Sequence, residues 1–391
     1  MKALNSRWVA IIVFTAAVLK LAVMYLDLWS HFQTGDFPVY YTSGWVLRHG
    51  ANPYTTDLRA LSVAAGIPMV LSHATDPPTF LMLVAPLTRY SVHTCYWIWQ
   101  GINLAAFVVG IWLLLSPRFS GLPKWTAVAL AGFALMFPPA GNCLVIAQNK
   151  VMVLCLLAAM WRFLERDRAM GAGMCLALAS MLRVFPALVF FYLLIQRRWK
   201  AAIWTCVFGI VIAAITLYGV GLDVMLSFRQ GISTLTIPGF IDQASNISLN
   251  GILSRILWSA DFSDFSRHLV TAAADLVVFA IVARASFRND QDGRIFALWP
   301  IAAVLISPTA WFHYMVLALI PIAFVFSSWN NHKLADSTPI KWEVIGYLAT
   351  AVVGVFLTQN TPAYGLYSAL NLEFLVLAVL FWSGYVFATA I

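Results

Sequence analysis

Residues 91–115 read SVHTCYWIWQGINLAAFVVGIWLLL, a stretch without a single Lys, Arg, Asp or Glu. Such a run is long enough to cross a hydrocarbon core of about 30 Å as a helix. Similar apolar blocks recur along the 391-residue chain, which is 61% hydrophobic, 10% charged and has a mean hydropathy of +0.82. Because soluble domains carry about 25% charged residues, this composition excludes a soluble protein and predicts a polytopic membrane protein.

Apolar blocks divide the whole chain, and we interpret about twelve of them (10–13) as transmembrane helices. They are 8–26, 91–115, 125–137, 149–164, 169–181, 184–196, 199–219, 267–286, 295–308, 311–328, 342–358 and 364–388. The first block follows basic residues as a signal sequence would. It lacks a small-x-small cleavage site, so we interpret it as a retained helix. The fold predicted is all-α, with a single membrane-embedded domain over residues 1–391.

Basic residues indicate which side of the membrane each loop faces. They flank residues 169–196 on both sides, at 162, 166 and 168 and at 197, 198 and 200. Cytoplasmic loops are rich in Lys and Arg, so both flanks belong to the cytoplasm and the chain must turn near Arg183. The same rule puts both termini inside and two long loops, 27–90 and 221–266, outside. Helical spans predict the bacterial cytoplasmic (inner) membrane, since outer-membrane proteins are built of strands.

Several function classes find no support in the sequence. The net charge of +8 (24 Lys and Arg against 16 Asp and Glu) is largely accounted for by cytoplasmic loops, without a nucleic-acid partner. Five cysteines lie in or beside apolar segments without metal-ligand spacing, and no glycine-rich nucleotide-binding motif occurs. We therefore predict neither a metal nor a cofactor, and no ATP-driven pump.

A first group of polar residues lies in the loop 27–90. Aromatic and apolar residues recur at near-helical spacing after Asp36, with Tyr40 and Tyr41 among them, and Gly50 follows as a stop signal. This pattern predicts an amphipathic helix along the membrane surface. Asp36 fits an N-cap ahead of Pro38 as well as it fits a catalytic acid. Asp76, before Pro77 and Pro78, fits a cap better than a site residue, and the apolar stretch 79–87 fits an interfacial or re-entrant helix.

A second group lies at the predicted outer ends of the later spans. Gln148 and Asn149 can bind sugar hydroxyls or satisfy frayed helix ends, and Lys150 can bind a phosphate or extend to the interface. Arg183 offers a forked donor that matches a phosphate, and we favour this interpretation over an interfacial arginine. Arg255 is a second candidate phosphate ligand. The remaining candidates are Asn246 and Asn250 in a polar loop and Trp311 and His313 between two spans.

Together these residues supply a carboxylate, arginines, a histidine and amides among aromatic side chains. A carboxylate can deprotonate a hydroxyl, and a cation can stabilise a phosphate leaving group. Glycosyl transfer from a lipid phosphate needs both. The rival classes are a transporter or flippase of lipid-linked sugars, whose polar groups would line a path to both faces, and a non-catalytic membrane scaffold.

At the same residues the sequence resembles the membrane glycosyltransferases of family 87, which have the GT-C fold. The resemblance rests on six motifs in order, found at Asp36 with Tyr40-Tyr41 and 50–54, Pro77-Pro78, Gln148-Asn149, Arg183-Val-Phe-Pro186, 246–251 with Arg255, and 307–311 with His313-Tyr314. The chain departs from the family pattern at 147–149, where Ala-Gln-Asn stands in place of Gly-Gln-x-Asn, and at Arg183, where the pattern Lys-x-x-Pro predicts lysine.

The resemblance implies an inverting transfer of a sugar, with a hexose such as mannose favoured, from a polyprenyl-phosphate donor to a lipid or glycan acceptor at the extracytoplasmic face. It implies that Asp36 is the general base and that His313 neighbours the donor phosphate. Donor phosphate binding then falls to Arg183, Arg255 and Lys150. The substrate contacts expected are Tyr40, Tyr41, Asp76, Gln148, Asn149, Asn246, Asn250 and Trp311.

Overall fold

The computed structural model describes residues 6–30, 36–64, 67, 73–116, 120–259, 263–288, 290, 293–330, 378, 381–382 and 385. Throughout these residues the secondary structure is helical, which confirms the all-α prediction for the described part of the chain. The predicted span 342–358 and nearly all of 364–388 lie outside it.

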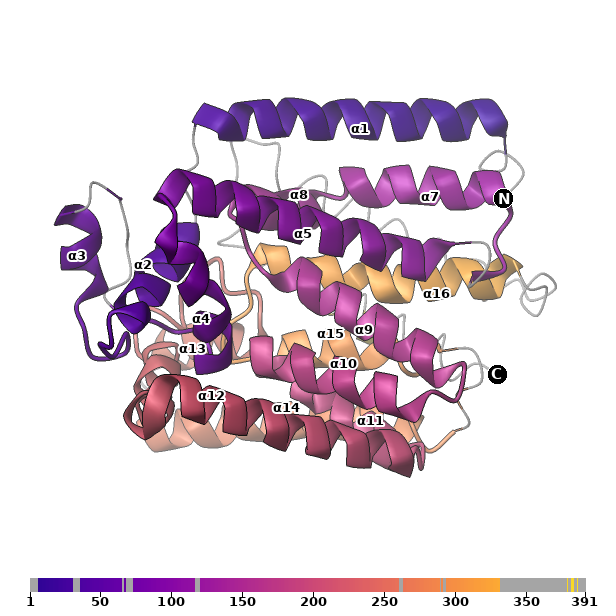
Figure 1. Cartoon of the computed structure of the whole chain (residues 1–391). Helices are drawn as coiled ribbons and strands as arrows, with labels where there is room; N and C mark the ends of the chain where they lie inside the picture. Colours follow the sequence, from indigo (N-terminus) through magenta and orange to yellow (C-terminus); the bar gives the residue numbers. More distant parts are fainter. Residues whose placement is uncertain are drawn as a thin grey trace.

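The helices follow the apolar blocks closely, most with bounds within a few residues of those predicted (Figure 1). They are α1 (Arg7–Ser30), α2 (Phe37–Arg48), α3 (Leu58–Ala64), α4 (Pro78–Val84), η1 (Ala85–Arg89), α5 (Val92–Leu115), α7 (Lys124–Met136), α8 (Pro138–Val145), α9 (Lys150–Leu164), α10 (Ala169–Leu182), η2 (Phe185–Leu188), α11 (Val189–Ile195), α12 (Trp199–Thr234), α13 (Leu249–Ser259), α14 (Asp264–Ala285), α15 (Leu298–Ile306), η3 (Phe312–Ala318) and α16 (Leu319–Asn330).

Fewer helices than predicted are long enough to cross a membrane alone. Within the described residues, four pass on length and hydropathy, namely Arg7–Trp29, Val92–Leu115, Trp199–Thr234 and Asp264–Ala285. A fifth span results if Lys124–Met136 and Pro138–Val145, bent by 50°, form one broken helix. The blocks 149–164, 169–181, 184–196, 295–308 and 311–328 gave α-helices of at most 15 residues, which at 1.5 Å per residue fall well below about 30 Å. The structure therefore supports four or five spans and leaves twelve as a prediction.

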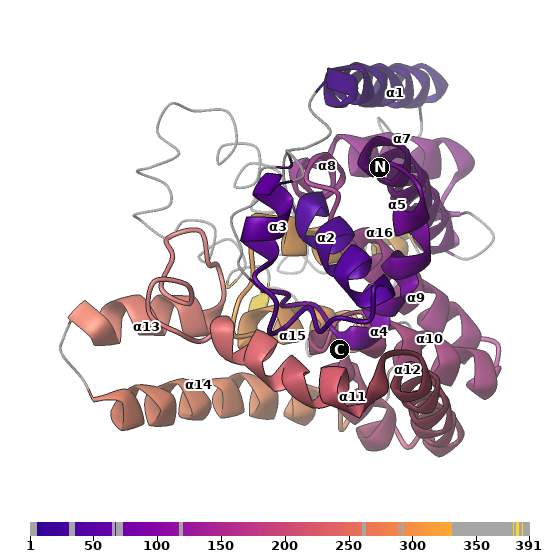
Figure 2. The same cartoon turned by 60° about the vertical axis from the view of Figure 1, so that its left-hand side comes forward.

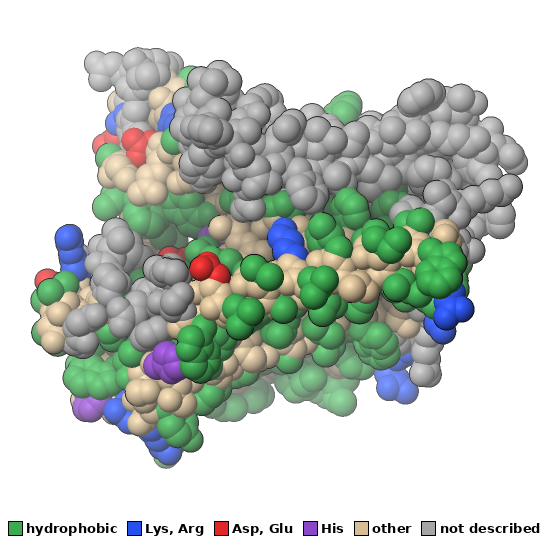
Figure 3. Space-filling model, turned by 90° about the horizontal axis from the view of Figure 1, so that it is seen from above, with side chains coloured by type: hydrophobic (Ala, Val, Ile, Leu, Met, Phe, Trp, Pro, Cys, Tyr) green, Lys and Arg blue, Asp and Glu red, His purple; other side chains and the backbone are tan. Residues whose placement is uncertain are grey.

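The bundle core lies around the short helices. Nearly all of α15 and η3 is buried, including Trp299 and Val316. Around them α5 packs on α9, α9 on α10, and α10 on α12. Small residues permit the closest of these contacts, since a Cβ atom on Gly173 of α10 would lie 2.6 Å from the backbone nitrogen of Thr205 in α12. By contrast, the described residues on the face that includes α1 carry many exposed hydrophobic side chains (Figure 3), as a surface against lipid requires.

The predicted turn near Arg183 is present. The backbone of Arg183 is extended (φ −150°, ψ 136°) between α10 and η2. The two ends of the segment lie together, because Arg198 Nη1 is 3.9 Å from Asp167 Oδ1. Residues 169–195 therefore run across the bundle and return, as their basic flanks indicate.

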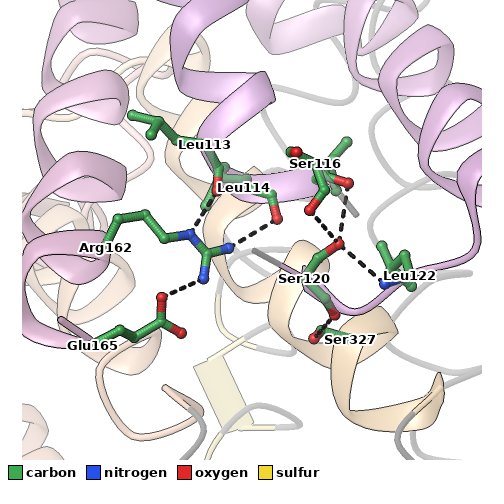
Figure 4. A network of polar contacts seen from close by, with 9 residues as sticks. Leu113, Leu114, Ser116, Ser120, Leu122, Arg162, Glu165 and Ser327 are labelled. Carbon is green, nitrogen blue, oxygen red and sulfur yellow. Dashed lines mark hydrogen bonds and ion pairs between the residues drawn. The ribbon is translucent and has the colours of Figure 1, made fainter. Parts of the chain in front are cut away.

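A polar network joins α5 and α9 at the end of the bundle that carries the basic segments 162–168 and 197–200 (Figure 4). Arg162, which the sequence suggests is a loop charge, is instead 5% exposed. Its guanidinium donates to the carbonyl oxygens of Leu113 (2.7 Å) and Leu114 (3.2 Å) at the end of α5 and pairs with Glu165 (2.6 Å). These contacts satisfy carbonyls that a helix end leaves open, so α5 and α9 end at the same level.

The opposite end carries the loop helices α2, α3, α4 and η1, which come forward in Figure 2. The predicted helix after Asp36 is α2, and Gly50 adopts the left-handed φ of +75° just beyond it. Its residues are buried on more than one side, against α4, η1 and α5, so it is a packed helix rather than a one-sided surface helix. The stretch 79–87 forms α4 and η1, in agreement with the short helix predicted.

Candidate active site

A cavity of about 560 Å³ opens at the end of the bundle that carries α2 and α4. Six separate parts of the chain line it, and most of the predicted site residues are among them. The lining consists of Asp36, Val39, Tyr40, Thr75, Asp76, Asn142, Ile146, Gln148, Lys150, Arg183, Leu235, Phe240, Gln243, Ser245, Thr309, Trp311, Phe312, His313 and Tyr314. Residues as far apart in the chain as Asp36 and Tyr314 thus meet at one place, which the sequence order alone does not require.

Asp36 stands at the N-cap of α2 but does not cap it with its side chain. Its carboxylate Oδ2 instead accepts a hydrogen bond from Gln148 Nε2 across the cavity wall. Its backbone N–H donates to the carbonyl of Ile146 at 3.2 Å, which fixes the start of α2 against the loop after α8. Of the two interpretations that the sequence left open, the side-chain cap is absent, and the carboxylate faces the cavity.

Burial raises the pKa of the Asp36 carboxyl above its ordinary value. The hydrogen bond from Gln148 and the positive charges of Lys150 and Arg183 oppose this shift, because each stabilises the carboxylate form, and Asp76 adds to it. The balance leaves a carboxyl of raised proton affinity, which is the property that a general base requires.

Gln148 lies at the centre of the polar contacts. Its side-chain Oε1 accepts from Tyr40 Oη (2.8 Å), Arg183 Nη2 (3.2 Å) and Lys150 Nζ. The backbone just before it, at Ala147, adopts a left-handed conformation with φ of 58°. That conformation favours glycine, which gives a physical reason for a family pattern with glycine there. It turns the chain so that the side chain of Gln148 enters the cavity wall.

Arg183 has four hydrogen-bond or ion-pair partners, and one of them is the Gln148 Oε1 atom described above. Its Nη1 pairs with Asp76 Oδ1 at 2.5 Å, its Nε donates to Asn149 Oδ1 at 2.8 Å, and its Nη2 donates to Tyr40 Oη at 2.8 Å. The preference for Asp76 as a helix cap is wrong, because Pro77 holds the N-cap position of α4 and the Asp76 side chain, 3% exposed, is the ion-pair partner of Arg183.

Lys150 and His313 complete the polar wall. Lys150 is 1% exposed and its Nζ lies 4.5 Å from the ring centre of Tyr314, so it does not extend to an interface. His313 is 3% exposed, and its Nε2 has no hydrogen-bond partner within the described part of the chain. A buried ring nitrogen without a partner beside a cavity is available to a ligand. Trp311 lines the same wall and packs edge-on against Phe240.

Five predicted residues do not line the cavity. One of them, Asn149, accepts a hydrogen bond from Arg183 Nε behind the wall. Tyr41 donates to the carbonyl of Tyr90, and Asn250 to both oxygens of Asp275 (3.1 Å each) and to the carbonyl of Ile306. Asn246 links its loop to Pro308 and Ala310. The Arg255 guanidinium donates to the carbonyls of Gln243 (2.6 Å) and Asn246 (3.2 Å). All five therefore hold segments or side chains around the cavity in place.

Sequence reasoning missed other parts of the lining. Thr75 and Gln243 carry ordinary polar groups in loops, and Leu235 and Phe240 are apolar residues in the predicted outer loop 221–266. Ser245 and Thr309 lie beside or inside the motifs at 246–251 and 307–311 but were not singled out as site residues. Asp275 was missed as the partner of Asn250 because it lies inside an apolar block. An acidic residue in such a block is itself a signal.

A second, smaller cavity of about 290 Å³ adjoins the first. It shares Thr75, Arg183, Leu235, Thr309 and Tyr314 with it, and its other lining residues are mainly apolar: Pro77, Val184, Phe185, Leu188, Phe228, Ile232, Ala303, Ile306, Ser307 and Pro308. A polar cavity thus continues into an apolar one. Among the described residues, no cluster of three or more His, Cys, Asp or Glu is arranged to hold a metal ion.

The chain is similar to known glycosyltransferases. The sequence model of Glycosyltransferase family 87 matches residues 74–308, a range that includes Gln148 and Arg183 but neither Asp36 nor His313. A polyprenol-phosphate-mannose-dependent alpha-(1-2)-phosphatidylinositol pentamannoside mannosyltransferase of Mycobacterium tuberculosis (strain CDC 1551 / Oshkosh) is 26% identical over 286 residues. That match covers 72% of this chain and 64% of the relative. The protein of the same name from Mycolicibacterium smegmatis (strain ATCC 700084 / mc(2)155) is 26% identical over 286 residues, with 72% and 67% covered.

Proposed function

The chain belongs to glycosyltransferase family 87, and from that premise we propose that it transfers a hexose, mannose in the first instance, from a polyprenyl phosphate to a lipid or glycan acceptor. The two mycobacterial relatives carry both the donor and a phosphatidylinositol mannoside acceptor in their names. The observation that carries the proposal is the meeting of Asp36, Lys150 and His313 on one polar cavity that continues into an apolar one.

The two cavities match the two parts of such a donor. The sugar phosphate is polar and anionic, and the wall of the larger cavity offers Lys150, Arg183 and the free Nε2 of His313. The isoprenoid chain is apolar, and the smaller cavity offers aliphatic and aromatic walls. Arg183 and Tyr314 line both, so the phosphate belongs at their junction. Arg255 is left out of this set, because its guanidinium is engaged with backbone carbonyls.

Asp36 acts as the general base in the proposed reaction. An acceptor hydroxyl oxygen attacks the anomeric carbon and forms the new glycosidic bond, while Asp36 takes the hydroxyl proton. The bond from the anomeric carbon to the phosphate oxygen breaks, and its electron pair leaves with the polyprenyl phosphate. Cationic and hydrogen-bonding groups lower the energy of that leaving anion. A single displacement of this kind inverts the anomeric configuration.

We propose the extracytoplasmic face of a bacterial cytoplasmic membrane as the place of this reaction. The cavity lies at the end of the bundle opposite the basic segments 162–168 and 197–200. Since basic segments face the cytoplasm, the cavity end faces away from it. Both termini are expected in the cytoplasm on the same rule.

The test is an assay of purified protein with polyprenyl-phosphate [¹⁴C]mannose and a phosphatidylinositol mannoside acceptor. The proposal expects radiolabel in the acceptor and release of unlabelled polyprenyl phosphate. A transport assay uses the same protein in liposomes that carry the donor in one leaflet only. Movement of the intact donor to the other leaflet without its cleavage would support a flippase and contradict the proposal.

A further inference from the structure

The side chain of Gln148 connects the proposed base to the cations of the cavity. Its Nε2 donates to Asp36 Oδ2, and its Oε1 accepts from Tyr40, Lys150 and Arg183. Three donors on Oε1 fix which end of the amide is oxygen. If the amide were reversed, its NH₂ group would face three other donors, one phenol and two cations. The amide can therefore present only its N–H end to the carboxylate.

This amide is buried along with its partners. Gln148 is 4% exposed, Tyr40 and Lys150 are 1% exposed, and the Arg183 side chain is 12% exposed. Water has little access to replace any of these hydrogen bonds. The contacts bring together residues from α2, the loop between α8 and α9, the start of α9 and the end of α10. A rotation of the Gln148 side chain would leave three buried donors without an acceptor, which is costly.

We propose that Gln148 is a positioning residue for Asp36 rather than a ligand of the sugar. It holds Oδ2 of the carboxylate, so that Oδ1 is the oxygen that meets the acceptor hydroxyl. It also polarises its N–H toward the carboxylate, because the cations Lys150 and Arg183 draw charge onto Oε1. This inference rests on the proposed function for Asp36, and it replaces the expectation that Gln148 contacts substrate.

The inference makes the ionisation of Asp36 depend on Gln148. Removal of a hydrogen bond to the charged form of an acid favours its protonated form. Other charged or titratable groups also face this region and are not themselves substituted when Gln148 alone is changed: Tyr40 on α2, Asp76 before α4, Lys150 on α9, Arg183 after α10, and His313 and Tyr314 on η3. A shift that follows the substitution of Gln148 is therefore assigned to its amide.

The experiment compares Gln148→Met with Gln100→Met. Gln100 is an equally buried glutamine, 1% exposed, whose Nε2 donates to Tyr96 Oη and to the carbonyl of Leu144, outside the cavity. The pH dependence of kcat is measured at saturating donor. We expect the acidic limb of the Gln148→Met profile to move about one to two pH units upward, with the donor KM within about threefold. We expect the Gln100→Met profile to keep the limb of the unmodified protein.

A Gln148→Met protein that turns over more slowly but keeps the acidic limb of the unmodified protein overturns the inference. If its turnover is too slow to measure, infrared titration decides. The band of the protonated Asp36 carboxyl is obtained as the difference from Asp36→Asn in each background. An unshifted titration in Gln148→Met contradicts the inference, and an upward shift supports it. Full turnover of Asp36→Asn would instead remove the proposed base, whatever Gln148 does.

Discussion

The ion pair between Asp76 and Arg183 should be worth far more to stability than any surface pair of this protein. Its atoms Oδ1 and Nη1 are 2.5 Å apart, and the two side chains are 3% and 12% exposed. The pair joins the residue before the α4 N-cap to the end of α10. The perturbation is a double-mutant cycle that consists of Asp76→Ala, Arg183→Met and both together.

The magnitude follows from what each change leaves behind. Removal of one partner of a buried pair costs about 3–5 kcal/mol, because the other charge remains buried. We expect Asp76→Ala to lower the free energy of unfolding by about 3 kcal/mol, since Arg183 keeps its contacts with Tyr40, Gln148 and Asn149. We expect Arg183→Met to lower the free energy of unfolding by about 5 kcal/mol, since it removes those contacts as well. The double variant leaves no unpaired charge, so we expect a coupling of about 2–3 kcal/mol.

The assay is the free energy of unfolding in mixed detergent and sodium dodecyl sulfate, measured for all members of the cycle. Asp264 and Arg267, an i,i+3 pair at the start of α14 with Asp264 81% exposed, provide the matched control. Pairs of this kind contribute at most about 1 kcal/mol. A coupling between Asp76 and Arg183 no larger than that of the control pair would refute the reasoning.

Three further predictions concern the reaction and the fold. Burial raises the pKa of Asp36, and a general base must be deprotonated. As the pH is lowered, kcat should therefore begin to fall at a pH above the ordinary aspartate pKa of about 3.9. A kcat that stays constant down to about pH 4 would count against this. Transfer should survive dialysis against EDTA, and activity that returns only with added divalent cation would disprove it. Gly221 lies in the kink of α12 at φ +83° and ψ 163°. Gly221→Ala should lower the free energy of unfolding by about 1–3 kcal/mol. Gly209→Ala in the same helix should be neutral or stabilising, and thermal unfolding of both variants can show the difference.

The sequence was sufficient for the helices and for the approximate membership of the site. Apolar block lengths and basic flanks predicted α5, α10 and the return of the chain at Arg183, because these features are local. Asp36, Gln148 and His313 were singled out because each is a polar residue beside an apolar block. The structure brings all three to one cavity.

What the sequence could not supply was the partner of each polar group. A carboxylate before two prolines has the pattern of a cap, and only the fold places Asp76 against Arg183. Lys150 has the pattern of an interfacial lysine, yet the close approach of η3 buries it against Tyr314. The number of predicted transmembrane helices exceeds the number that the described residues support for a related reason. A short apolar block such as α15 is surrounded by other helices, and hydropathy does not distinguish protein from lipid as its neighbour.

The central claim is that Asp36 removes a proton from the acceptor, and it is tested most directly by the rate of mannose transfer in Asp36→Asn. The control is Asp57→Asn, a carboxylate of the same loop whose Oδ1 caps α3 by accepting from the N–H groups of Arg59 and Ala60, and where Asn retains the cap. We expect Asp36→Asn to lose about 10²–10⁴-fold in kcat while it still binds polyprenyl phosphate, and Asp57→Asn to keep its rate. Transfer by Asp36→Asn at the rate of the unmodified protein would contradict the account.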